Sequence, residues 1–151
     1  MLVTALNFPD GPDDHAAIQA LRTALSDPET ARVIRAAQDV VTLLAKGGIY
    51  MDDLSPAAIP PAVWRRLAAG GRSAALTELA AVSDAGMLDL AAGMMRNDEV
   101  FRDAAHHFLR QYDRTLARVG EDLNDTGLAA MADTRSGRAF ILLAQVAAMP
   151  R

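Results

Sequence analysis

The stretch NDEVFRDAAHHFLRQYDRTLARVG, residues 97–120, decides the fold because one apolar face runs along its whole length. At 100° per residue, six apolar side chains of this stretch fall within about 80° of one another. They are Phe101, Ala105, Phe108, Tyr112, Leu116 and Val119. Asp98 and Glu99 favour a helix start, and Gly120 favours a helix end. The stretch therefore predicts one long amphipathic helix that packs against a core.

The opposite face of this helix is polar and carries the adjacent histidines His106 and His107. Asp103 precedes them by three and four residues, so it can pair with either and favour the protonated imidazole. The two rings diverge by about 100° around the helix, which suits chelation of one metal ion poorly. The chain also has no Glu-x-x-His motif of the di-iron bundle type. The pattern predicts a solvated surface pair, with an interface contact or a catalytic or metal role as alternatives.

Start and stop signals divide the rest of the chain into further helices. Ser26, Asp27 and Pro28 combine a capping side chain with proline in the first turn, and the glycine pair at 47–48 ends the helix that follows. The expected helices cover about residues 13–25, 26–47, 61–70, 73–82, 84–96, 126–132 and 134–149. No convincing run alternates with period two. The predicted fold is all-α, a single compact multi-helix bundle of about seven or eight helices, irregular rather than a simple four-helix up-down bundle.

Length and composition are typical of one helical domain, which we place at residues 13–151, after an extended or poorly ordered arm at residues 1–12. Cysteine is absent, which excludes disulfides, zinc-thiolate sites and thiol catalysis. The start of the chain lacks the basic region of a signal peptide, and no stretch reaches the ~20 apolar residues of a membrane span. The sequence therefore predicts a soluble cytoplasmic protein.

The net charge of −4 argues against binding to nucleic acid. Fourteen of the fifteen basic residues are arginine, whose planar guanidinium pairs bidentately with carboxylate or phosphate. An abundance of arginine and alanine is also typical of a GC-rich bacterial genome. Composition alone therefore does not indicate an anion site.

The last expected helix is apolar on nearly every side, with Gln145 the only polar residue between positions 139 and 149. Such a helix lies either in the centre of the core or in an interface between two copies of the chain. Gly137 would allow another backbone to approach closely. Before it, Asp133 is the expected N-cap.

Arg135 and Arg138 lie three residues apart at the start of that helix and share a face. They could bind an acidic partner or clamp Asp103 or Asp113 on the neighbouring long helix. Trp64 is a candidate interface anchor because tryptophan is enriched at binding hot spots. The alternative for this single tryptophan is a place in the core.

No residues complete a catalytic, cofactor or metal motif, so the sequence does not predict an enzyme. We expect a small helical protein with an adaptor, regulatory or assembly role, acting on an unknown protein partner or as a homo-oligomer through its apolar C-terminal helix. The alternative is a ligand-binding or enzymatic helical domain that uses the polar face of the long helix. The candidate polar cluster is Asp103, His106, His107, Arg110, Asp113, Arg114, Arg135 and Arg138.

Overall fold

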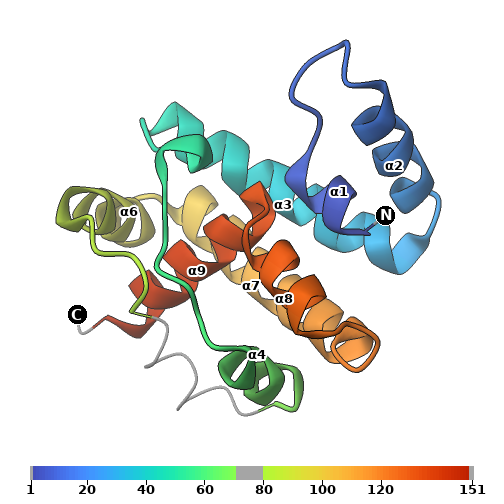
Figure 1. Ribbon diagram of the computed structural model, residues 1–151. Helices are drawn as coiled ribbons and strands as arrows, with labels where there is room; N and C mark the ends of the chain where they lie inside the picture. Colours follow the sequence, from blue (N-terminus) through green and yellow to red (C-terminus); the bar gives the residue numbers. More distant parts are fainter. Residues whose placement is uncertain (1, 71–79, 150–151) are drawn as a thin grey trace.

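The computed structural model describes residues 2–70 and 80–149, and these form eight α-helices, one short 3-10 helix and no strand (Figure 1). The helices are α1 (Leu2–Asn7), α2 (His15–Leu25), α3 (Pro28–Lys46), η1 (Met51–Asp53), α4 (Pro61–Ala68), α6 (Ala85–Asn97), α7 (Glu99–Val119), α8 (Asp125–Ala132) and α9 (Arg135–Ala148). The predicted all-α fold is confirmed. The helix expected at residues 73–82 lies outside the described residues except for 80–82, which are not helical.

Helix α7 forms one wall of the core, as its apolar stripe predicts. Phe101, Phe108 and Tyr112 are fully buried, and α7 packs against α3, α4, α6 and α9. The rings of Tyr112 and Phe140 stack with centroids 4.3 Å apart, which joins α7 to α9. The side chain of Asp98 accepts a hydrogen bond from the amide of Phe101 and so caps the first turn.

Helix α9 lies at the centre of the molecule (Figure 1) and packs against α1, α3, α6, α7, α8 and η1. All six residues from Ala139 to Ala144 are buried. The neighbouring helices of the same chain cover its apolar faces, so these faces are not exposed for the expected homo-oligomer interface, and a homo-oligomer stays a prediction. The alternative, a central core helix, accounts for its composition.

The N-terminal segment differs from the expected extended arm, because residues 2–7 form helix α1. A six-residue helix is not stable alone, since nucleation is costly. Its stability comes from packing: Ala5 and Leu6 are fully buried, and α1 contacts α2, α3 and α9. Phe8 then adopts a positive φ of 63°, and the helix ends.

Local capping explains why the helices begin where they do. Five N-cap side chains accept a hydrogen bond from the amide three residues later: Asp14, Asp27, Asp84, Asp98 and Asn124. The last helix is the exception to the prediction, since Thr134 rather than Asp133 is its N-cap. The Thr134 hydroxyl accepts from the amide of Gly137 at 2.9 Å and donates to the carbonyl of Met131 at 2.7 Å. Asp133 instead ends α8 and pairs with Arg138.

Gly137 allows α9 to cross closely over the end of α8. A Cβ at this position would lie 2.6 Å from the carbonyl oxygen of Ala132, and the carbonyl of Met131 is closer still. The close backbone approach expected at this glycine is therefore present, and it lies within the chain.

Candidate functional site

The polar face of α7 does not form one site, because its residues border different hollows. His106 lies between two of them. One hollow, of about 400 Å³, lies where α6, α7 and α9 meet, and Arg102 borders it. The other, of about 260 Å³, lies between α7 and α9 and includes Arg110 and Asp113.

Asp103 and His107 are exposed and border neither of these hollows. Arg102 joins α7 to the end of α6, because its guanidinium donates to the carbonyls of Met95 at 2.7 Å and Arg96 at 2.8 Å. Across residues 2–70 and 80–149, no three His, Cys, Asp or Glu side chains come together in a way that could hold a metal ion. The histidine pair thus lies on the surface without a surrounding set of ligands.

Arg135 lies at the start of α9 and holds three segments together in what we call the arginine clasp: Arg135, Asn7, Phe8, Asp10 and Asp52. Its guanidinium donates to Asp10 at 2.6 Å, to Asp52 at 2.8 Å and to the carbonyl of Asn7 at 2.9 Å. The hydrogen bond from Arg135 lowers the pKa of Asp52, and the two carboxylates raise the pKa of Arg135. These contacts join the N-terminal segment, η1 and α9.

Arg138 extends the same region, donating to Asp133 at 3.0 Å and to the carbonyl of Met51 at 3.2 Å. The expected clamp of Arg135 and Arg138 on Asp103 or Asp113 is therefore corrected. The two arginines instead pair with acids on the chain segments around the start of α9. This placement separates them from the candidate residues on α7 and gives them a structural role.

Trp64 lies in the core, 2% exposed, with its ring centroid 6.1 Å from that of Phe140. The prediction of an interface anchor at Trp64 is wrong, because Val63, Trp64 and Leu67 form the buried face of α4. Its neighbour Arg65 is the surface residue, and it pairs with Asp125 at 2.7 Å.

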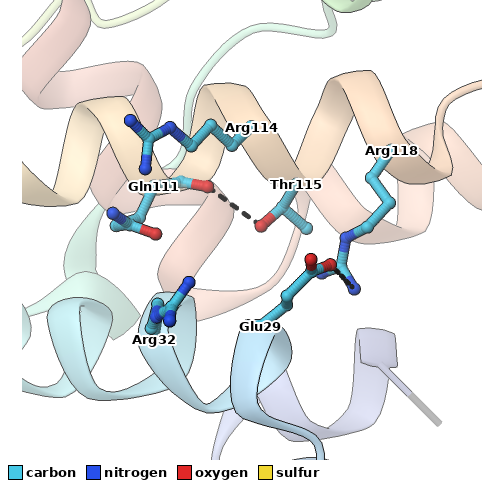
Figure 2. A pocket seen from close by; sticks show the side chains of 6 residues that line it. All are labelled: Glu29, Arg32, Gln111, Arg114, Thr115 and Arg118. Atoms are coloured by element: carbon cyan, nitrogen blue, oxygen red, sulfur yellow. Dashed lines mark hydrogen bonds and ion pairs between the residues drawn. The ribbon is translucent and has the colours of Figure 1, made fainter.

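A polar groove of about 280 Å³ lies between α3 and α7, with no counterpart in the predicted cluster except Arg114. We call it the arginine groove, and its lining residues are Glu29, Arg32, Gln111, Arg114, Thr115 and Arg118. Figure 2 shows that α3 contributes Glu29 and Arg32 from one side and α7 contributes the other four. The start of α3 therefore lies beside the last turns of α7.

Two of the groove's three arginines lack an ion pair with any part of the chain that the structure describes. Arg118 pairs with Glu29 at 3.3 Å and with Asp27 at 3.6 Å. Hydrogen bonds from the Thr30 hydroxyl and amide, with a smaller contribution from Arg118, lower the pKa of Asp27. Arg32 and Arg114 make no such contact within residues 2–70 and 80–149, so their charges are not compensated there.

The floor of the groove holds buried polar groups. Gln111 is 9% exposed as a whole residue, its carboxamide atoms are not fully buried, and they form no hydrogen bond with the described residues. The buried hydroxyl of Thr115 donates to the main-chain carbonyl of Gln111 at 2.9 Å (Figure 2). The carboxamide of Gln111 therefore remains available to the groove.

Helix α6 presents a second unusual surface, apolar rather than charged. Only Ala91 and Ala92 of this helix are buried, whereas Leu90 is 45% exposed. What we call the α6 face consists of Gly86, Leu90 and Gly93 on the outer side, bordered by Met87 and Met94, which are partly buried against the core. Beside its end, Val100 at the start of α7 is 69% exposed. In Figure 1, α6 lies at the edge of the molecule.

No family model, no curated protein and no solved structure matches this chain. Within the described residues, no helix is both long and apolar enough to cross a membrane. The arginine groove and the α6 face are the two surfaces whose chemistry suggests that they bind something.

Proposed function

We propose that this protein acts by binding another protein, in an adaptor, regulatory or assembly role, and that the α6 face receives an amphipathic helix of the partner. The observation that carries the proposal is the exposure of Leu90 on a helix that is largely apolar and only partly covered. A cluster of exposed apolar side chains is typical of interaction sites.

The shape of the α6 face suits a helix. A Cβ added at Gly93 would have only the end of the Arg96 side chain within 4.0 Å, so space is open above this position. Gly86 lies seven residues earlier on the same side, and together the two glycines allow a close backbone approach on either side of Leu90. Met87 and Met94, which pack partly against the core, border this face with flexible apolar side chains.

Charge around the α6 face specifies the partner further. From residue 84 to residue 99, the exposed charged side chains are Asp84, Asp89, Arg96, Asp98 and Glu99. Four acids surround the apolar face against one base. A partner helix with lysine or arginine flanking its apolar side would therefore associate faster and bind more selectively.

A photo-crosslinking amino acid at position 90 tests this proposal in cells that produce the protein. The same group at Ala130, exposed on α8, is the control. We expect a crosslink from position 90 to an amphipathic, basic-flanked helix of another protein, identified by mass spectrometry. The substitution Leu90→Asp should lower capture of that partner at least tenfold, and Ala130→Asp should leave it within twofold.

Three results would contradict the proposal. Crosslinking of equal strength from positions 90 and 130 would indicate non-specific contact. Loss of capture in both aspartate variants would show that the α6 face is not the determinant. A crosslink to a second copy of the chain, together with a dimer in light scattering, would replace the partner protein with self-association.

A further inference from the structure

The arginine groove combines three features that the fold itself does not use. Arg32 and Arg114 face the same hollow from different helices without an acid to balance them in the described part of the chain. The carboxamide of Gln111 lines that hollow and has no hydrogen-bond partner in the same part of the chain, although its N and O atoms are not fully buried. Two guanidinium groups and a carboxamide, none engaged with the described chain, therefore offer their N–H donors to the groove.

An anion would satisfy all three features at once. Guanidinium groups form paired hydrogen bonds with phosphate oxygens, and the Gln111 side chain offers two further N–H donors. Glu29 already neutralises Arg118 at 3.3 Å, so the charges left unbalanced are those of Arg32 and Arg114. These two guanidinium groups, neither of them in an ion pair, provide the donors for one phosphate group.

We propose that the arginine groove binds a small phosphate-bearing dianion, held by Arg32 and Arg114 and by the carboxamide of Gln111. Its volume of about 280 Å³ lies just below the range of roughly 300–1,000 Å³ typical of small-molecule pockets. The ligand is therefore inorganic phosphate or a phosphate monoester with a small attached group. This site is separate from the α6 face and does not depend on the proposed function.

Isothermal titration calorimetry at constant ionic strength tests the site, with inorganic phosphate and glycerol phosphate as probes and chloride as the reference anion. We expect saturable binding of at least one phosphate probe. The double variant Arg32→Gln/Arg114→Gln should weaken that binding at least tenfold. Tighter binding of glycerol phosphate assigns the site to a phosphate monoester, and tighter binding of inorganic phosphate assigns it to the free ion.

The matched control is the double variant Arg35→Gln/Arg110→Gln. It removes the same charge from the same two helices, at positions that do not line the groove. Phosphate affinity within twofold of the wild-type value supports the groove. Equal weakening in the two double variants would show diffuse attraction to surface charge and overturn the proposal, as would the absence of saturation by either probe at tens of millimolar.

Gln111→Leu adds a readout that surface charge does not affect. It replaces the unpaired carboxamide with an apolar side chain of similar size. Because the Gln111 carboxamide makes no hydrogen bond with the described residues, the thermal midpoint without phosphate should change little, while phosphate affinity falls at least fivefold. Unchanged phosphate affinity in this variant would remove Gln111 from the site and contradict the proposal.

Discussion

The Tyr112 side chain is fully buried, and its hydroxyl has no hydrogen-bond partner among the described residues. Its ring stacks on that of Phe140 with an angle of 18° between the planes. Burial raises the pKa of Tyr112, so the phenol stays neutral throughout the ordinary pH range. The ring therefore stabilises the core by packing, whereas the unpaired hydroxyl lowers the free energy of unfolding.

We therefore expect Tyr112→Phe to increase the free energy of unfolding by about 1 kcal/mol, because it removes a buried polar group that lacks a partner. Urea denaturation monitored by circular dichroism measures the change. Tyr50→Phe is the matched control, since Tyr50 is 54% exposed and should change stability by no more than about 0.5 kcal/mol. A loss of stability in Tyr112→Phe would show that the hydroxyl has a favourable partner, such as a bound water.

At the scale of elements, the crossing of α8 and α9 depends on Gly137. We expect Gly137→Ala to lower the free energy of unfolding by about 1–3 kcal/mol or more, because its methyl group would meet the carbonyls of Met131 and Ala132. The same substitution at Gly93, in open space within α6, should raise it by about 0.5–1 kcal/mol. Thermal unfolding of the two variants checks that stability falls in Gly137→Ala and rises in Gly93→Ala. Equal changes in stability would contradict the close crossing of α8 and α9.

Most helix boundaries could be predicted from the sequence because capping is local. Asp27 and Asp98 cap the helices that begin just after them, and their spacing to the capped amide is visible in the sequence. Helix α1 could not be predicted this way, because it has no capping signal and depends on burial of Ala5 and Leu6 by other helices.

The arginine groove was predictable only in part. Arg110, Arg114 and Arg118 recur every four residues along α7, and such a row of like charges indicates either repulsion or a shared anion. Its other half, Arg32, lies on α3, and no local pattern shows that α3 and α7 pack side by side. The candidate cluster predicted from the sequence is instead the polar face around His106 and His107, for which the sequence shows no further ligands.

For the molecule as a whole, the arginine clasp joins segments that are remote in sequence. Arg135→Gln should lower the free energy of unfolding by about 1–3 kcal/mol, because two carboxylates and the carbonyls of Asn7 and Phe8 lose a charged donor. Asp10→Asn and Asp52→Asn should each cost less than about 1 kcal/mol, since these carboxylates are 71% and 68% exposed. Urea denaturation would contradict the clasp if Arg135→Gln cost no more than the asparagine variants.

Thermal unfolding of Arg135→Gln at different pH values gives an independent measurement of the clasp. The pKa of Asp52 in the folded protein lies below its ordinary value of 3.8. The contact therefore stabilises the protein above that value, and its contribution is lost as the pH falls from about 5 through the lowered pKa. In Arg135→Gln the pKa returns toward 3.8, so the thermal midpoint should fall less between about pH 5 and pH 3 than in the wild type.

The contacts between α1 and α9 also bear on how the chain folds as it is made. The Arg135 amide donates to the side chain of Asn7, and the two residues are 128 positions apart. At about 5–20 residues per second, on the order of ten seconds separate their synthesis on the ribosome. During that interval the apolar stripe of α7 and the buried side of α1 have been made, but the helix that covers both has not. A nascent chain halted before α9 should therefore expose a core surface to chaperones and proteases.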